Sequence, residues 1–158
     1  MGPIVFVCRR LLPTPATDVA NGVLDLERWS DFAGYGPVPG IRAATFEKRT
    51  EAVVGTRIRV VNRDGSTHLE EIVEWEPERR LRLWLSDFSR PMSWLAHGFE
   101  ERWDFQADPA GTQVTRTFAL HPRGLVSRPW LWLISRLLRR AIQRHLEQMA
   151  QAGSIPHG

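Results

Sequence analysis

The sequence predicts an α+β fold in which an antiparallel sheet of about seven strands packs against a long C-terminal α-helix. The first observation is a β-branched segment, Ile4 to Leu12, which is followed by two short helical patterns. The second is a run of strand patterns that begins at Ile41 and is divided by three turn sequences. The third is an amphipathic stretch of about 24 residues near the end of the chain. Its apolar stripe needs a partner, and the one-sided sheet is the large apolar face available.

The composition is typical of a globular protein. The chain has 158 residues, of which 42% are hydrophobic and 25% charged, so one domain with its own core is expected. We expect a single domain over residues 1–153 and a flexible tail over residues 154–158. Cys8 is the one cysteine, which excludes a disulfide within the chain and favours a reducing compartment. Neither a signal-peptide pattern nor a run long enough to span a bilayer is present, so a cytoplasmic protein is expected.

The net charge of +3 is distributed unevenly. Residues 122–158 hold six arginines and one acidic residue, whereas residues 1–121 hold fifteen basic and seventeen acidic residues. The arginine-rich end, with Trp130 and Trp132 beside Arg128 and Arg136, is compatible with weak contact to an anionic membrane surface through the C-terminal helix. The alternative is a solvated helix face in which Trp130 packs under the sheet edge and Trp132 is partly exposed.

The first third of the chain predicts one strand and two short helices. The segment Ile4 to Leu12 reads as a strand, and two prolines that follow end it. Over residues 15–32, apolar residues recur near helical spacing, and Gly22 and Asp25 divide this stretch into two short helices.

Three turns divide the middle of the chain into hairpins: Asp64-Gly65, the turn around Pro77, and Asp108 to Gly111. Each turn predicts a register, and in every case the apolar face of one strand meets the apolar face of the next. The predicted neighbours are Ile58 with Glu71, Val60 with Leu69, Trp75 with Leu81, Val73 with Leu83, Phe105 with Val114, and Trp103 with Arg116.

The chain closes with a long amphipathic helix. Ser127 is the expected N-cap, and Pro129 suits the first turn. Most of the arginines of this stretch lie off the apolar stripe, which consists of Leu131, Ile134, Leu138, Ile142, His145 and Met149.

This layout resembles the START-like superfamily, also called SRPBCC, and more closely its polyketide cyclase/dehydrase-like branch. The resemblance is carried by the segments FVCRRLLPTPATDVANGVLDLERWSDF, GPVPGI and VGTRIRVVNRDGSTHLEEIVEWEPERRL, and by the closing helix. It implies the helix-grip fold, in which a curved antiparallel sheet wraps around the long C-terminal helix and leaves a cavity between them. It also implies binding of apolar small molecules, and a minority of the superfamily are enzymes. The matching motifs are structural, so they predict the fold and leave the chemistry open.

The segment GYGPVPGI, Gly34 to Ile41, has the glycine and proline content of a loop but not the pattern of a nucleotide-binding loop. Its glycine spacing is one residue too long, a helix precedes it, and Pro37 and Pro39 remove two backbone N–H donors. A stiff connection is expected. The resemblance implies that this region borders the mouth of the cavity, so Tyr35 and Val38 are candidate residues at its rim. The alternative is a plain rigid connection.

Polar side chains interrupt the strand face that is predicted to point inward: Asn62, Glu71, Asp87, Glu101, Arg116 and, by parity, His97. Glu101 and Arg116 lie diagonally on neighbouring strands, within reach of each other. Three interpretations stay open: a structural ion pair, strand ends that turn these groups into solvent, and polar anchors for a ligand in an apolar cavity.

His145 lies on the apolar stripe of the last helix, either as a satisfied core residue or as an acid or base in the cavity. If the protein is an enzyme, Glu101 and His145 are the candidate acid and base, and Arg116 is the group that polarises an oxygen. The candidate ligand-binding residues are Tyr35, Val38, Asn62, Glu71, Trp75, Leu83, Asp87, His97, Phe99, Trp103, Phe118, Ile134, Leu138 and Ile142.

Several functions are disfavoured. Acidic residues alternate with the tryptophans of the strands, which argues against nucleic acid as a partner. No spacing among the histidines, acids and Cys8 predicts a metal site, no cofactor is expected, and Cys8 reads as a core residue.

The favoured function is binding of one apolar small molecule, lipid-like, polyketide-like or aromatic, between the sheet and the last helix. The alternative is a cyclase- or dehydrase-type enzyme that acts on such a molecule. A third candidate is an interaction protein that uses the basic helix.

Overall fold

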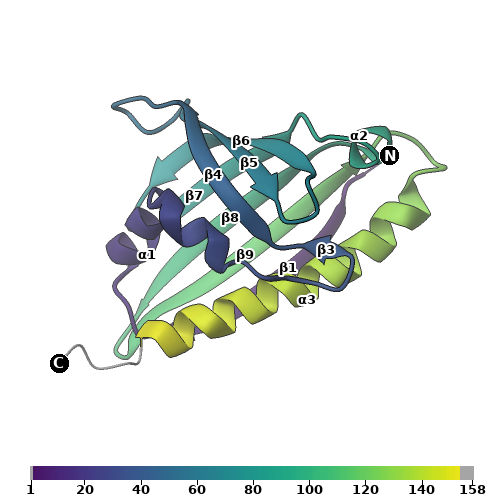
Figure 1. Ribbon diagram of the computed structural model, residues 1–158. Coiled ribbons are helices and arrows are strands. Elements are labelled where there is room, and N and C mark those ends of the chain that lie inside the picture. Colours follow the sequence, from purple (N-terminus) through teal and green to yellow (C-terminus); the bar gives the residue numbers. More distant parts are fainter. Residues whose placement is uncertain (1, 154–158) are drawn as a thin grey trace.

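Seven strands form one antiparallel sheet in the order β1-β9-β8-β7-β6-β5-β4, as the computed structural model in Figure 1 shows. The structure describes residues 2–153, and the predicted tail over residues 154–158 lies outside the described residues. The strands are β1 Ile4–Leu12, β4 Ile41–Lys48, β5 Arg57–Asn62, β6 Thr67–Glu76, β7 Arg80–Ser86, β8 Ala96–Asp108 and β9 Gly111–Pro122. A separate pair consists of β2 Gly34–Tyr35 and β3 Val38–Pro39.

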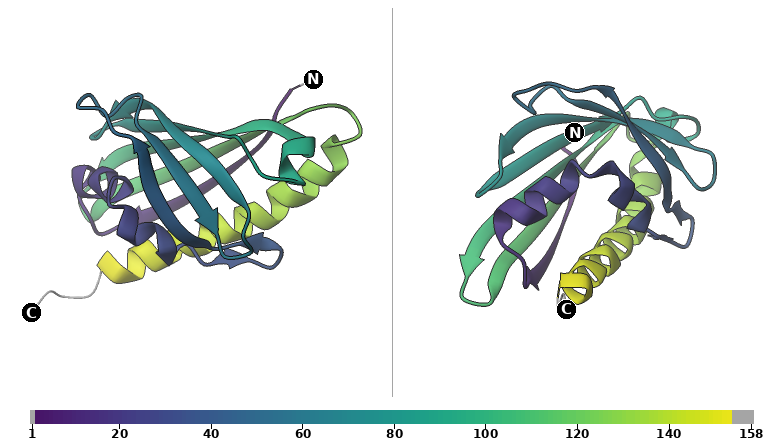
Figure 2. Two further views of the ribbon diagram at one scale, coloured as in Figure 1. Left: turned by 45° about the horizontal axis from the view of Figure 1, so that its top comes forward. Right: turned by 60° about the vertical axis from the view of Figure 1, so that its left-hand side comes forward.

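The long helix α3, Arg128–Gly153, runs along the concave side of the curved sheet (Figure 2). It packs mainly against β1 and also contacts β9 and the β2–β3 hairpin. The helix α1, Ala16–Val23, and the 3₁₀ helix η1, Leu26–Asp31, follow β1 as two short helices. A further short helix, α2, Met92–Leu95, precedes β8 and was not expected from the sequence. The predicted α+β fold, with its sheet around a C-terminal helix, is confirmed.

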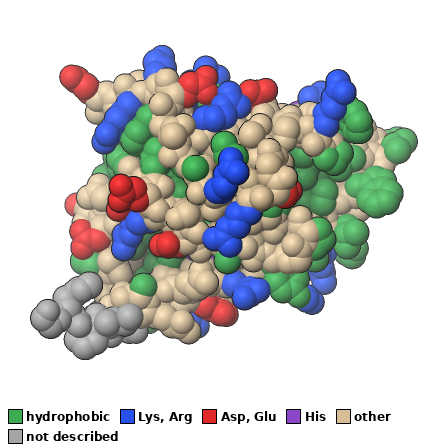
Figure 3. Space-filling model, in the orientation of Figure 1, with side chains coloured by type: hydrophobic (Ala, Val, Ile, Leu, Met, Phe, Trp, Pro, Cys, Tyr) green, Lys and Arg blue, Asp and Glu red, His purple; other side chains and the backbone are tan. Residues whose placement is uncertain are grey.

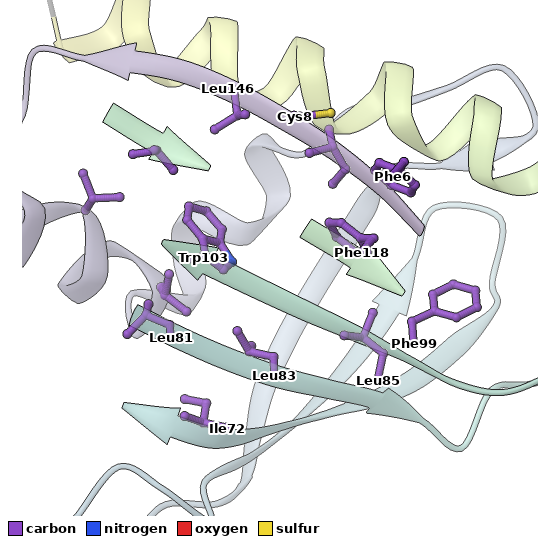
Figure 4. Close-up of a cluster of buried hydrophobic side chains, with 14 of the residues drawn as sticks. Phe6, Cys8, Ile72, Leu81, Leu83, Leu85, Phe99, Trp103, Phe118 and Leu146 are labelled. Atoms are coloured by element: carbon purple, nitrogen blue, oxygen red, sulfur yellow. The ribbon is translucent and has the colours of Figure 1, made fainter. Parts of the chain in front are cut away.

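One cluster of buried side chains joins the inner face of the sheet to α3 (Figure 4). Strands contribute alternate residues, so Leu81, Leu83 and Leu85 of β7 all point into this cluster. Leu131, Ile142 and Leu146 of α3 close it from the other side. The buried residues come from both ends of the chain, so β1 and α3 cannot be removed without opening the core.

The β8–β9 hairpin has the predicted register, with Phe105 opposite Val114 and Trp103 opposite Arg116. This turn was predictable because Asp108 pairs with Gly111 across a two-residue loop.

The β5–β6 hairpin differs from the prediction by one residue. Its turn has three loop residues rather than two: the Asn62 N–H donates to Ser66 O, and the Gly65 N–H donates to Asn62 O. Gly65 adopts a positive φ of 89°, as expected for the left-handed residue of a three-residue loop. The pairs are therefore Ile58 with Glu70 and Val60 with His68.

This shift reverses the faces of the first half of β6, because side chains alternate from one face to the other. His68, Glu70 and Ile72 are buried on the inner side, opposite the buried residues of β5. The predicted inward position of Leu69, and that of Glu71, is wrong. A β-bulge after Ile72 then restores the predicted pairing of Trp75 with Leu81, while Leu83 pairs with Ile72 instead of Val73.

One local prediction is also corrected. Ser127 Oγ hydrogen-bonds to the N–H and the C=O of Gly124, so its side chain stabilises the turn before α3 and does not cap the helix. The segment Gly34 to Gly40 forms the small β2–β3 hairpin. A Cβ atom at Gly34 would clash with the carbonyl oxygen of Val38, and Gly34 has a positive φ of 76°, so only glycine fits this turn.

Within residues 2–153, the structure contains no helix that combines the length and the apolar composition needed to cross a membrane.

Candidate functional site

Glu101 and Arg116 form an ion pair inside the protein. They lie on the adjacent strands β8 and β9, one step apart diagonally, because Glu101 pairs with Phe118 and Trp103 with Arg116. Arg116 Nη2 lies 2.9 Å from Glu101 Oε2 and 3.2 Å from Oε1. The two residues are only 6% and 5% exposed, so both charges are removed from water. A buried charge is tolerated only with a close partner, which each supplies to the other.

Trp103 completes the environment of the carboxylate. Its Nε1–H donates to Glu101 Oε1 at 2.7 Å, and the Arg116 guanidinium carbon lies 4.0 Å from the centre of a Trp103 ring. Every contact of the carboxylate is therefore with a donor, as expected for an acceptor. Burial raises the pKa of Glu101, and the charge of Arg116 opposes this effect, while the nearby charge of Glu70 adds to it.

His145 joins this group from α3. Arg116 Nη1 lies 3.0 Å from His145 Nδ1. An arginine can only donate, so Nδ1 accepts, and the neutral ring carries its proton on Nε2. Burial, and then the charge of Arg116, lowers the pKa of His145 to about 3. The ring of Phe32 meets the imidazole edge to face at 5.6 Å. His145 is thus a neutral ring. Its Nδ1 already accepts a hydrogen bond and cannot take up a proton freely, and its Nε2–H is a donor.

Arg116 Nε is a buried donor with no hydrogen-bond partner among the described residues. Nη1 and Nη2 are occupied by His145 and Glu101. A buried donor without a partner costs about 1–3 kcal/mol. We call Glu101, Trp103, Arg116 and His145 the arginine cluster.

A second polar pair, which sequence reasoning missed, lies on the inner face of β6. His68 Nε2 and Glu70 Oε2 are 2.9 Å apart, and both residues are buried. The ring of Phe88 lies 5.7 Å from the imidazole and 4.8 Å from the ring of Phe99. A three-residue loop over residues 63–65, had it been assigned from the sequence, would have placed these residues inward.

The other residues predicted to bind a ligand divide into two groups. The first group is buried in the core or packs against it: Leu83, Phe99, Phe118 and Ile142 are buried, and Trp75, Ile134 and Leu138 are partly buried. Tyr35 and Val38 are partly buried on the β2–β3 hairpin, and Arg140 of α3 donates to the Tyr35 hydroxyl at 2.8 Å.

In the second group, the predicted inward orientation is wrong for every residue except Asn62. Glu71 is on the outer face and pairs with Arg57 at 3.2 Å, because the register of β6 is shifted. Asp87 is exposed and pairs with Arg59, since β7 ends at Ser86 and Asp87 turns away with a positive φ of 52°. His97 is exposed beside Arg123 at a β-bulge in β8, which breaks the alternation used to place it. Asn62 is buried, but its side chain donates to Ser66 in the β5–β6 turn.

Two open, shallow hollows lie on the described part of the molecule, and the residues that line them lie outside the space between α3 and the sheet. One, of about 350 Å³, is lined by Thr17 and the turn Glu76 to Arg79. The other, of about 300 Å³, lies between η1 and β4. The residues that line them include no member of the arginine cluster. Among residues 2–153, no group of three or more His, Cys, Asp or Glu side chains is arranged to hold a metal ion.

The sequence matches the family model for polyketide cyclase/dehydrase and lipid transport over residues 5–153. A comparison with curated protein sequences gives no significant match.

Solved structures share the fold at low sequence identity. TTHA0849 from Thermus thermophilus is 21% identical, with a TM-score of 0.70 over 96% of this chain and 100% of that protein. The major latex-like protein 151 from Panax ginseng is 12% identical, with a TM-score of 0.66 over 99% of this chain and 100% of that chain. The di-domain ARO/CYC protein BexL of the BE-7585A biosynthetic pathway is 17% identical, with a TM-score of 0.68 over 97% of this chain and 51% of that chain.

Proposed function

The chain belongs to the polyketide cyclase/dehydrase and lipid transport family, and from this premise we propose that it binds one apolar small molecule between the sheet and α3. Membership supports a hydrophobic ligand-binding or cyclase role. We favour binding, and we propose that the ligand carries an oxygen atom that accepts hydrogen bonds from the arginine cluster.

The unpaired Nε of Arg116 is the observation that carries this proposal. A ligand oxygen that accepted its hydrogen would remove the cost of the unsatisfied donor, which is about 1–3 kcal/mol. The neutral ring of His145 supplies a second donor, Nε2–H, from the helix side. Two donors in an apolar surrounding favour a carbonyl, carboxylate, phenolate or sulfonate oxygen over a basic group.

The apolar part of the ligand would lie along the inner stripe of α3. Ile134 and Leu138 are only partly buried there, whereas Leu131 and Ile142 on the same stripe are fully buried. The middle of the stripe, where burial is incomplete, is therefore the expected place for apolar contact with a ligand. Neither of the two hollows described above lies there, and we propose that side chains between α3 and the sheet move apart to admit the ligand.

A cyclase-type activity is the second candidate, and the pair His68–Glu70 is the observation that favours it. A carboxylate 2.9 Å from an imidazole nitrogen orients the ring, as in many acid–base sites. The arginine cluster is less suited to proton transfer, because Glu101 accepts from two donors and His145 Nδ1 is occupied by Arg116.

The test uses anilinonaphthalene sulfonate, an aromatic fluorescent probe with an anionic oxygen group, and oleate as competitor. Leu138→Trp should fill the space and weaken probe binding about tenfold or more, with the circular dichroism spectrum retained. Gln148→Trp is the matched control, because Gln148 is exposed on the same helix and lies outside the site. Unchanged binding in Leu138→Trp would refute the proposed location. If that variant fails to fold, Ile134→Phe repeats the test with a smaller increase in volume.

The role of the polar donors is tested separately with His145→Phe. This variant should weaken binding of the sulfonate probe more than binding of phenylnaphthylamine, which has no anionic group. Equal losses for both probes would contradict a specific contact with the ligand oxygen.

If the protein is instead a cyclase, His68→Gln should abolish turnover of an aromatic polyketide-like substrate while probe binding is retained.

A further inference from the structure

Six large apolar side chains are exposed at one end of the molecule. They lie on α2, on the loop over residues 123–127 and on the first two turns of α3, and each is between 48% and 87% exposed: Trp94, Leu125, Val126, Trp130, Trp132 and Leu133. We call these six residues, with the arginines described below, the α2–α3 tip. Hydrophobic side chains gather at the end of the space-filling view where α2 and the start of α3 lie (Figure 3).

The segments of the tip are held together. The Arg123 N–H donates to Leu95 O at 3.0 Å, and the Arg123 side chain donates to Ser93 O, so the loop is joined to α2. The Leu131 N–H donates to Ser127 O, so the loop is also joined to the first turn of α3. The exposed side chains therefore form part of an ordered surface, although Trp94 is remote from the other five in the sequence.

The tip is basic. Arg90 lies just before α2 and Arg123 in the loop, and Arg128 and Arg136 lie on the first three turns of α3. The guanidinium of Arg90 lies 5.3 Å from a Trp94 ring, and that of Arg136 lies 5.4 Å from a Trp132 ring. Neither residues 88–99 nor residues 121–146 contain an aspartate or a glutamate. Apolar and positively charged side chains are thus interleaved without compensating acids.

Such a surface matches the boundary of an anionic lipid bilayer. Tryptophan rings favour the level of the headgroups, and aliphatic side chains enter the acyl region just below it. Arginines bind the lipid phosphates in the same layer. A symmetric contact with a second copy of this chain would instead bring arginines against arginines, which opposes association.

We propose that the protein docks on anionic membrane surfaces through the α2–α3 tip. The exposed residues Leu125, Val126 and Trp130 enter the interface, and the four arginines contact the headgroups. This interaction goes beyond the binding of a small molecule in the interior, and it stands or falls separately, because none of these residues belongs to the arginine cluster.

The test is co-sedimentation with vesicles of phosphatidylcholine alone and of phosphatidylcholine mixed with phosphatidylglycerol. We expect at least tenfold stronger binding to the anionic vesicles, weaker binding as sodium chloride is added, and a blue shift of tryptophan fluorescence. Binding that is absent, or equal for both vesicle types, would overturn the proposal. So would a dimer in sedimentation velocity that tip substitutions dissociate, because the tip would then join two copies.

Matched variants locate the surface. Val126→Ser should weaken vesicle binding several-fold, whereas Val54→Ser, at a valine that is 45% exposed in the loop before β5, should not. The double variant Arg90→Gln, Arg136→Gln should weaken vesicle binding about 25-fold at low salt, because each charge contributes about fivefold. The control double variant Arg9→Gln, Arg79→Gln should have a much smaller effect. Equal losses in the test and control variants would show attraction by net charge alone and overturn docking by the tip. Binding of an acidic protein to the tip, without binding of anionic vesicles, would also overturn the proposal.

Discussion

Beneath α3, charged side chains lie among apolar ones, whereas at the α2–α3 tip apolar side chains lie in solvent among arginines. Glu101 and Arg116 are almost completely buried, while Val126 is 87% exposed. Both regions depart from the usual distribution of residues, but they differ in how many contacts hold each side chain. The interior residues bond to one another, so a change there affects stability. The tip residues are largely exposed, so a change there should affect interaction alone.

The largest expected effect comes from breaking the buried ion pair. Arg116→Met leaves the Glu101 carboxylate buried without its charged partner. We expect the free energy of unfolding, measured by urea denaturation at neutral pH, to fall by about 3–5 kcal/mol.

The double variant Glu101→Leu with Arg116→Met is the control. It removes both charges, so it should recover most of the loss. A single variant that is destabilised by less than about 1 kcal/mol would contradict a buried, paired charge at this position.

The next effect is a dependence of stability on pH. The pKa of His145 is lowered to about 3 in the folded protein, so between about pH 6.5 and pH 3 the unfolded chain binds a proton that the folded protein does not. Stability is therefore lost as the pH falls through this range. From pH 7 to pH 4, the free energy of unfolding should fall by about 3 kcal/mol more in the wild-type protein than in His145→Gln. Denaturation at each pH measures this difference.

The variant is the reference because it shares all other titrating groups with the wild type. A difference that stays constant over this pH range, or a His145 imidazole that titrates near pH 6.5 in an NMR experiment, would count against the buried neutral ring.

A smaller effect separates two neighbouring glutamates that lie on opposite faces of β6. Glu70 is buried and its charge helps to raise the pKa of Glu101, whereas Glu71 pairs with Arg57 outside. Glu70→Gln should therefore lower the pKa of the Glu101 carboxyl, as followed by NMR, and Glu71→Gln should leave it unchanged. The opposite result would restore the register that a two-residue turn predicts.

The smallest effect on stability is expected at the tip. Leu125→Ser and Val126→Ser should change the free energy of unfolding by no more than about 0.5 kcal/mol, because both side chains are largely exposed. Thermal denaturation checks this, and the same samples should bind anionic vesicles less well. A loss of several kcal/mol would mean that these side chains belong to the folded core.

The sequence predicted the outline of the fold and part of the interior. Helical spacing on α3 and alternation on β8 and β9 placed Glu101, Arg116 and His145 on apolar surfaces. It could not predict that His145 accepts a hydrogen bond from Arg116, because these residues are 29 positions apart and meet only when α3 lies on the sheet. It missed His68 and Glu70 because both two- and three-residue loops suit Asp64-Gly65, and one residue of register reverses the faces of the strand.

The tip shows the same limit at the surface. Trp130 and Trp132 with their arginines were recognisable as a candidate membrane contact within one helix. The contribution of Trp94 was not recognisable. Strands β8 and β9 separate α2 from α3 in the sequence, and the two helices meet only when these strands have folded.

Local patterns in the sequence determined the elements of this protein, because helix and strand periodicity depends on residues a few positions apart. The tertiary structure alone decided which polar groups meet in the interior, which face of β6 is buried, and how far the pKa of His145 is lowered. These properties depend on the distance and burial of groups that are remote in the chain, and short-range periodicity carries no information about either.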